Sequence, residues 1–178
     1  MLMKSGRSRL AAGLSAAAVL SAGLAGAGAA AADDYTGWLI DPNVVIDTIA
    51  YTPGGPTPNP GGLPGAAMVY THRDGRTITD SVWVLADPAA AAAAVTQVRG
   101  AVTIANPKTE SVAVGTGGQL TSGTSADGSS SKSLLSFTQG NAASTIEFTG
   151  PIDDPVPADL VLQLGQEQDS LIKSRQGG

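Results

Sequence analysis

Hydrophobic and polar residues alternate along residues 131–149, a pattern that predicts two antiparallel strands joined by a loop at 139–142. If the loop has these four residues, one face of the hairpin is apolar and the other is polar. Such a sheet has a core on one side and water on the other. The apolar face carries Leu135, Phe137, Ile146 and Phe148, and the polar face carries Ser136, Thr138, Thr145 and Glu147.

A second hairpin is predicted at residues 68–86, on either side of Asp74-Gly75. An Asp-Gly pair between β-rich runs favours a two-residue type I′ turn, because that turn needs positive φ angles at both central positions. In this register Arg73 lies opposite Arg76. One face then carries Met68, Tyr70, His72, Thr77, Thr79, Trp83 and Leu85, and the other carries Val69, Thr71, Ile78, Val82 and Val84.

Two helices complete the pattern. Asp87 is expected to cap an alanine-rich helix that begins at Pro88 and ends at a left-handed Gly100, with Val95 and Val98 against the sheet. A second helix is predicted at 158–173, where a stripe at helical spacing should dock on the sheet. The stripe consists of Leu160, Val161, Leu164, Gln168, Leu171 and Ile172, and further extended segments are expected at 102–105, 110–114 and 119–125.

The segment at 51–65 contains five prolines and five glycines. This composition excludes a helix and is expected to break any strand pairing, so we interpret the segment as a mobile linker. Two alternatives are a lid over a ligand and a glycosylated loop, modified at Thr52 or Thr57. The residues before it, 33–50, are predicted to form an irregular stretch with a short strand or helical turn.

Together these elements predict an α+β fold, in which an antiparallel β-sheet packs against an Ala-rich helix and a C-terminal helix. We expect a single α+β domain at residues 66–176. An N-terminal segment and the Pro/Gly-rich loop precede it at 33–65, and residues 33–50 are expected to pack on the domain.

The first 32 residues have the order of a secretory signal peptide. Lys4, Arg7 and Arg9 give a positive start, an apolar run follows at 10–24, and small residues lead to Ala32. The apolar run is shorter than the roughly 20 residues that a membrane-spanning helix needs. We therefore predict cleavage near Ala32 and a protein that is secreted, either extracellular or in the cell wall, and does not span a membrane once processed.

Cleavage at this point leaves 146 of the 178 residues, enough for one domain with its own core. It removes three of the 10 basic residues and none of the 15 acidic ones, so the formal charge becomes seven minus 15, or −8. An acidic chain of this kind is a poor partner for nucleic acid or an anionic membrane. The chain has no cysteine, which excludes disulfides and thiolate metal sites. We expect a monomer.

Few residues point to catalysis. His72 is the only histidine, so a Ser-His-Asp triad would have to use it. A Ser-x-x-Lys match at 129–132 lies in a predicted turn rather than at a helix start, and we interpret it as coincidence. The pairs Asp33-Asp34 and Asp153-Asp154 lack the ligand spacing of a calcium loop and read as solvated carboxylates. We expect no catalytic residue, no metal ligand and no cofactor.

His72 and Tyr70 project from the same side of one strand, an arrangement that could hold haem iron or a small ligand. Because His72 lies one residue from the predicted hairpin tip, we favour a solvated surface residue instead. If a ligand site exists, we expect it at the Trp83 end of this face, with Tyr70, Trp83, His72 and Met68 facing the ligand.

Three segments resemble small exported actinobacterial proteins of the mycobacterial type: RTITDSVWVLADPAAAAAAV, LLSFTQGNAASTIEFTG and PADLVLQLGQEQDSLIKS. The layout is similar to the PsbP-like domains of mycobacterial lipoproteins. The chain lacks the lipobox cysteine of that pattern, so the resemblance implies a released protein. Such families are mostly of unknown function, and the resemblance transfers no site residue.

We therefore predict a secreted, non-catalytic binding or interaction protein of the bacterial cell envelope or medium, with a cell-envelope or host protein as its partner. The alternative is a carrier of a small apolar ligand, a lipid or haem, between sheet and helix. A hydrolase that uses carboxylates is the third hypothesis. A pocket lined by Trp83, Tyr70 and Met68 would favour the carrier, whereas a tightly filled core would favour the interaction protein.

Overall fold

The computed structural model describes residues 34–46 and 50–177. The predicted signal peptide lies outside these residues, so its cleavage stays a prediction. Within the described part of the chain, no helix is both long enough and apolar enough to cross a membrane.

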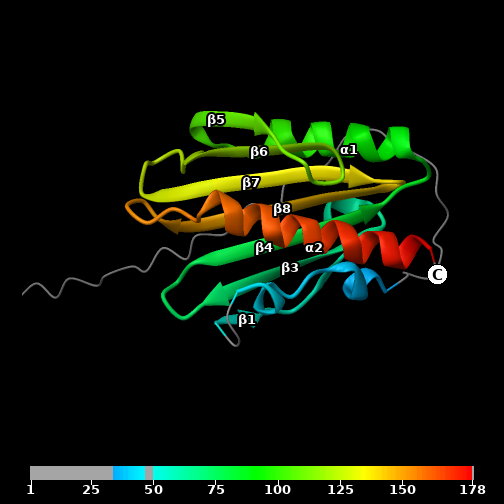
Figure 1. Cartoon of the computed structure of the whole chain (residues 1–178), viewed down its shortest axis with the longest axis horizontal. Helices are drawn as coiled ribbons and strands as arrows, with labels where there is room; N and C mark the ends of the chain where they lie inside the picture. Colours follow the sequence, from blue (N-terminus) through cyan, green and yellow to red (C-terminus); the bar gives the residue numbers. More distant parts are fainter. Residues whose placement is uncertain (1–33, 47–49, 178) are drawn as a thin grey trace, which may run out of the picture.

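The described chain forms an eight-stranded antiparallel sheet, two α-helices and three short 3-10 helices (Figure 1). This architecture confirms the predicted α+β fold. The 3-10 helices are η1 (Tyr35–Trp38), η2 (Pro42–Val44) and η3 (Pro60–Gly62), and the α-helices are α1 (Pro88–Ala101) and α2 (Ala158–Gln176). The strands are β1 (Tyr51–Pro53), β2 (Thr57–Pro58), β3 (Gly65–His72), β4 (Thr77–Val84), β5 (Ala105–Ser111), β6 (Thr116–Thr124), β7 (Ser130–Gln139) and β8 (Ala142–Pro151).

The strand order is β1-β3-β4-β8-β7-β6-β5, and β2 also pairs with β3. The strands β6, β7 and β8 form a meander at one side. The register of the β7–β8 hairpin, with Leu135 opposite Ile146 and Phe137 opposite Ser144, is the one expected for a four-residue loop. The predicted register is therefore confirmed, although β7 and β8 take in Gln139 and Ala142 and leave only Gly140 and Asn141 as the loop.

Helix α2 and the segment at 34–46 cover one face of the sheet, which we call the α2 face, and helix α1 packs on part of the opposite face, the α1 face (Figure 1). The α2 face holds the larger core, with Phe137, Ile146 and Leu164 fully buried. Because α1 packs on β7 and β8, Ser136, Thr138 and Thr145 are buried as well. The expectation that this side of the hairpin meets water is therefore wrong wherever α1 covers it.

Helix α1 begins as predicted and ends later. The side chain of Asp87 accepts a hydrogen bond from Ala90 N–H (2.8 Å), and Pro88 occupies the first turn. Val95 and Val98 are buried against the sheet. Gly100 does not end the helix in a left-handed conformation, as predicted, but lies inside it, because the helix continues to Ala101.

The β3–β4 turn has three residues rather than the predicted two. His72 N–H bonds to Arg76 O (2.8 Å), Gly75 N–H bonds to His72 O (2.9 Å), and Thr71 lies opposite Thr77. Only Gly75 in the turn has a positive φ, 91°, which fits a type I turn followed by a left-handed residue. This one-residue shift turns every side chain of β4 to the opposite face relative to β3.

The segment at 51–65 pairs with β3 through β1 and β2, so the prediction that its composition breaks the strand ladder is wrong. The sheet accommodates these prolines because β1 and β2 are short and lie at its edge. The carbonyl of Pro60 accepts a hydrogen bond from Trp83 Nε1 (2.9 Å), which ties the segment to the core. The residues before it form the 3-10 turns η1 and η2, in agreement with the predicted helical turn.

Candidate functional site

A pocket of about 50 Å³ opens where the β3–β4 turn meets the loop between β8 and α2. Its wall combines a charged pair, Arg76 and Asp154, with the aromatic ring of Tyr51. Hydroxyl and apolar groups complete the wall, among them Thr77, Ser131, Thr149, Phe148 and Leu160. This mixture of polar and apolar groups suits contact with a polar side chain.

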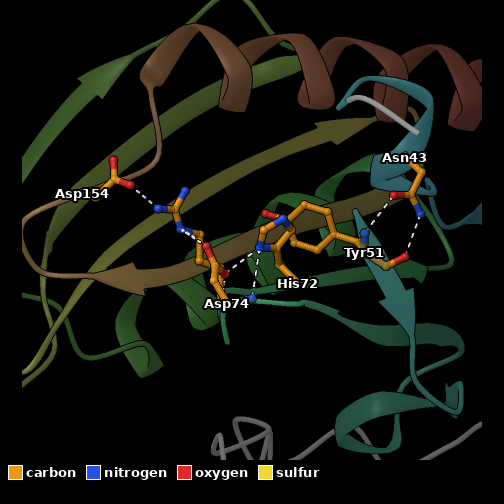
Figure 2. Close-up of polar contacts among 6 residues, drawn as sticks. Asn43, Tyr51, His72, Asp74 and Asp154 are labelled. Carbon is orange, nitrogen blue, oxygen red and sulfur yellow. Dashed lines mark hydrogen bonds and ion pairs between the residues drawn. The ribbon is translucent and has the colours of Figure 1, made fainter. Parts of the chain in front are cut away.

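Arg76 faces two carboxylates, Asp154 in the pocket wall and Asp74 in the neighbouring β3–β4 turn (Figure 2). Its Nη2 pairs with the carboxylate of Asp154, on the loop that leads to α2. Its Nε lies 3.2 Å from Asp74 Oδ2, although that N–H is not aligned well enough for a hydrogen bond. One guanidinium thus neutralises carboxylates from two segments that lie far apart in the sequence.

His72 is oriented by the same turn (Figure 2). Its Nδ1 lies 2.6 Å from Asp74 Oδ1 and 3.3 Å from the backbone N–H of Asp74. The shorter contact needs a proton on Nδ1, so we take the ring to donate to the carboxylate. A backbone hydrogen bond from Arg76 and the side-chain bond from His72 both lower the pKa of Asp74, which is therefore an anion at neutral pH.

Tyr51 links the pocket to the N-terminal segment (Figure 2). It lies opposite His72 in the β1–β3 pairing, and the two rings are 5.1 Å apart. Asn43 fixes the strand, because its side chain accepts from Tyr51 N–H (3.0 Å) and donates to Tyr51 O (2.9 Å). Burial is the main cause that raises the pKa of Tyr51, so the phenol stays neutral.

The geometry does not assemble a catalytic triad from these groups. The imidazole of His72 is held by Asp74, and no hydrogen bond found among the described residues joins it to Ser131. Nor do any three His, Asp or Glu side chains among the described residues come together closely enough to hold a metal ion. The mixed polar and apolar lining of the pocket makes it a candidate for binding.

The predicted ligand-facing residues do not share one face. Tyr70 is buried on the α2 face at 3% exposure, and Met68 packs beside that core. Trp83 is buried on the α1 face at 6% exposure, against the alanines of α1. The expectation of a common face is wrong because it relied on the two-residue turn. His72, with a side chain 24% exposed, lies near the turn as predicted.

A buried polar cluster was missed by the sequence reasoning. Asp80 and Gln168 are both fully buried on the α2 face, and Ile40 N–H donates to Asp80 Oδ2 (2.9 Å) and to Gln168 Oε1 (2.8 Å). Burial is the main cause that raises the pKa of Asp80 to about 8. A signal was available, since Gln168 interrupts the apolar stripe of the C-terminal helix.

Comparisons with known proteins support the fold. No family model and no curated protein matches the chain, so the likeness to PsbP-like domains gains no support. A solved structure with a similar fold is the extracellular domain of PknH from Mycobacterium tuberculosis, with a TM-score of 0.53 and 11% sequence identity. The match covers 82% of this chain and 97% of the PknH domain. At this identity the likeness concerns the fold alone.

Proposed function

We propose that this chain is an exported, non-catalytic interaction domain, and that the pocket beside Arg76 receives one polar side chain of a larger partner. The signal-like order of residues 1–32 supports export. So does the fold, which is similar to that of a domain described as extracellular. The partner is expected to be a protein of the cell envelope or of a host.

The observation that carries the proposal is the size of the pocket. A volume of about 50 Å³ is far below the roughly 300–1,000 Å³ of sites that enclose a small molecule. A single side chain that projects from a partner does fit such a space, and small, partly apolar pockets are typical anchor points of protein interfaces.

The core supports the same conclusion. The carrier hypothesis needs a cavity beside Tyr70, Trp83 and Met68. In the structure Tyr70 and Trp83 are instead buried in two separate clusters on opposite faces of the sheet. Their side chains fill the interior where a lipid or haem would have to lie.

The first test is native mass spectrometry of the protein purified from the culture medium of the organism that produces it. We expect the mass of the polypeptide alone. A lipid or haem that copurifies at stoichiometric amounts would overturn the proposal and restore the carrier hypothesis.

The second test places a photo-crosslinking amino acid at Leu160, a partly exposed position of α2 in the pocket wall, and at Glu167, an exposed position on α2 that serves as the matched control. We expect a crosslinked partner from Leu160 alone, and a loss of at least tenfold in its yield when Arg76→Ala is added. Arg76→Lys should recover little, because lysine lacks the planar fork that pairs with two carboxylates. Equal yields at the two positions would contradict the proposal.

A further inference from the structure

The segment at 34–46 crosses the α2 face and is held there by two other parts of the chain. Leu39 and Ile40 are buried in the core. Helix α2 contributes Gln168, whose Nε2 donates to Trp38 O (2.6 Å), and Arg175, whose Nε donates to Gly37 O (3.0 Å). Strand β4 contributes Asp80. Residues remote in sequence therefore meet on one short stretch of backbone.

The centre of this arrangement is the N–H of Ile40. It donates both to Asp80 Oδ2 (2.9 Å) and to Gln168 Oε1 (2.8 Å), so the two oxygens must lie close together. Two acceptors that converge on one hydrogen repel each other unless one of them carries a proton. The other oxygen of the Asp80 carboxyl is buried without a hydrogen-bond partner. Burial of this carboxyl, with one oxygen unpaired and no cation paired with it, therefore favours a protonated Asp80 and outweighs the opposite effect of the backbone N–H donors of Ile40 and Ser81.

We propose that residues 34–46 form a pH-dependent strap, latched to the α2 face by the neutral carboxyl of Asp80 and released when that carboxyl ionises. Release would withdraw Leu39 and Ile40 and uncover an apolar groove between β3 and α2. The strap would thereby control access to a surface separate from the pocket beside Arg76.

The charged and titratable groups around the latch do not offset an ionised Asp80. Tyr70 faces it from β3, and burial keeps that phenol neutral by raising its pKa. Asp41, on the strap itself, adds negative charge. On α2, Asp169 is already paired with Lys173 (2.6 Å). None of the ion pairs among the described residues includes Asp80.

The direction of the pH effect follows from burial. In the unfolded chain an aspartate ionises near its ordinary value, whereas burial raises the pKa of Asp80 in the folded protein to about 8. The folded state therefore binds the extra proton between these values. The latch contributes its full stability below about pH 4, and that contribution declines as the pH rises and is lost above about pH 8.

Hydrogen exchange at the amide of Ile40, measured by NMR on the purified protein between pH 6 and 9.5, tests the strap. We expect the protection factor, which corrects for base catalysis, to fall about tenfold per pH unit up to about pH 8, where the closed state also loses the proton, and then to level off. The amide of Phe137, in the centre of β7, should stay better protected than Ile40 at every pH, because it exchanges only when a larger part of the fold opens. In Asp80→Asn, which imitates the neutral acid, the protection of Ile40 should not change with pH.

Asp169→Asn is the matched control, because it neutralises a buried carboxyl on α2 that is paired with Lys173. It should retain the fall in Ile40 protection. The proposal is overturned if Ile40 protection in the natural protein changes less than twofold up to pH 9.5, or if Asp80→Asn shows the same fall. Should Asp80→Asn fail to fold, the carbon-13 titration of the Asp80 carboxyl decides, and a midpoint below pH 5 overturns the proposal.

Discussion

On the α2 face of the sheet, large side chains such as Phe137, Ile146 and Leu164 fill a core that extends to the N-terminal segment. On the α1 face, alanines and two valines of the helix pack against Trp83 and Ala143. Alanine brings the helix close to the sheet but buries little apolar area. The difference indicates that the α2 face supplies most of the stability, and the same face holds the buried pair Asp80 and Gln168.

The largest expected effect comes from Phe137→Ala, on the α2 face. Phe137 is fully buried, so the substitution should lower the free energy of unfolding by about 3–5 kcal/mol. The counterpart on the α1 face is Val98→Ala, which removes two methyl groups and should cost only about 1–2 kcal/mol. Denaturant unfolding of both variants measures the difference. Equal losses would contradict the ranking of the two faces.

Replacing one glycine in each helix by alanine should give a sharper contrast, because the two changes in stability have opposite signs. A Cβ atom on Gly165, in α2, would lie 2.2 Å from Leu135 Cδ2, whereas one on Gly100, in α1, meets nothing within 4 Å. Because Leu135 is fully buried and cannot move aside, Gly165→Ala should destabilise by about 1–3 kcal/mol. Gly100→Ala should stabilise by about 0.5–1 kcal/mol through helix propensity alone. Thermal unfolding distinguishes them, and a gain from Gly165→Ala would show that the α2 face is loosely packed.

The smallest effect is expected on the part of the α1 face that the helix leaves open. Lys132 and Glu147 form an ion pair there, with side chains 24% and 26% exposed. A double-mutant cycle of Lys132→Gln and Glu147→Gln should give a coupling energy below about 1 kcal/mol, and it should shrink in 0.5 M salt, about the range where charge screening becomes strong. A larger, salt-independent coupling would mean that this part of the α1 face is shielded from solvent.

The elements themselves were largely predictable, because their signals are local. Asp87-Pro88 marked the start of α1, and the alternation along β7 and β8 fixed both the faces and the register of that hairpin. In both cases the sequence offered a single consistent solution. The helical stripe after Pro157 likewise gave α2, although the helix extends to Gln176, past the expected end.

The register of the β3–β4 hairpin was not predictable from the same signals. Asp74-Gly75 fits a two-residue turn, but it also fits a three-residue turn in which only the glycine is left-handed. Alternation could not decide between them, since β4 has apolar residues on both of its faces. The choice depends on which side chains α1 and α2 cover, and that is tertiary information.

The candidate site was less predictable than the fold. The sequence singled out His72 and its neighbours, and the structure does place His72 beside the pocket. Arg76 and Asp154 come from segments far apart in the chain, so their pairing depends on β8 lying next to β4. The same holds for Asp80 and Gln168, which meet only because α2 packs across the sheet.

Both edges of the sheet are built in a way that affects how the protein meets other copies of itself. At one edge β1 and β2 are short and each contains a proline, and at the other β5 is interrupted by a bulge between Ala105 and Lys108 and carries Pro107. Short strands, prolines, bulges and lysine all discourage the addition of a further strand. Edge-to-edge stacking into fibrils is thereby opposed at both borders, and the domain should remain dispersed at high concentration.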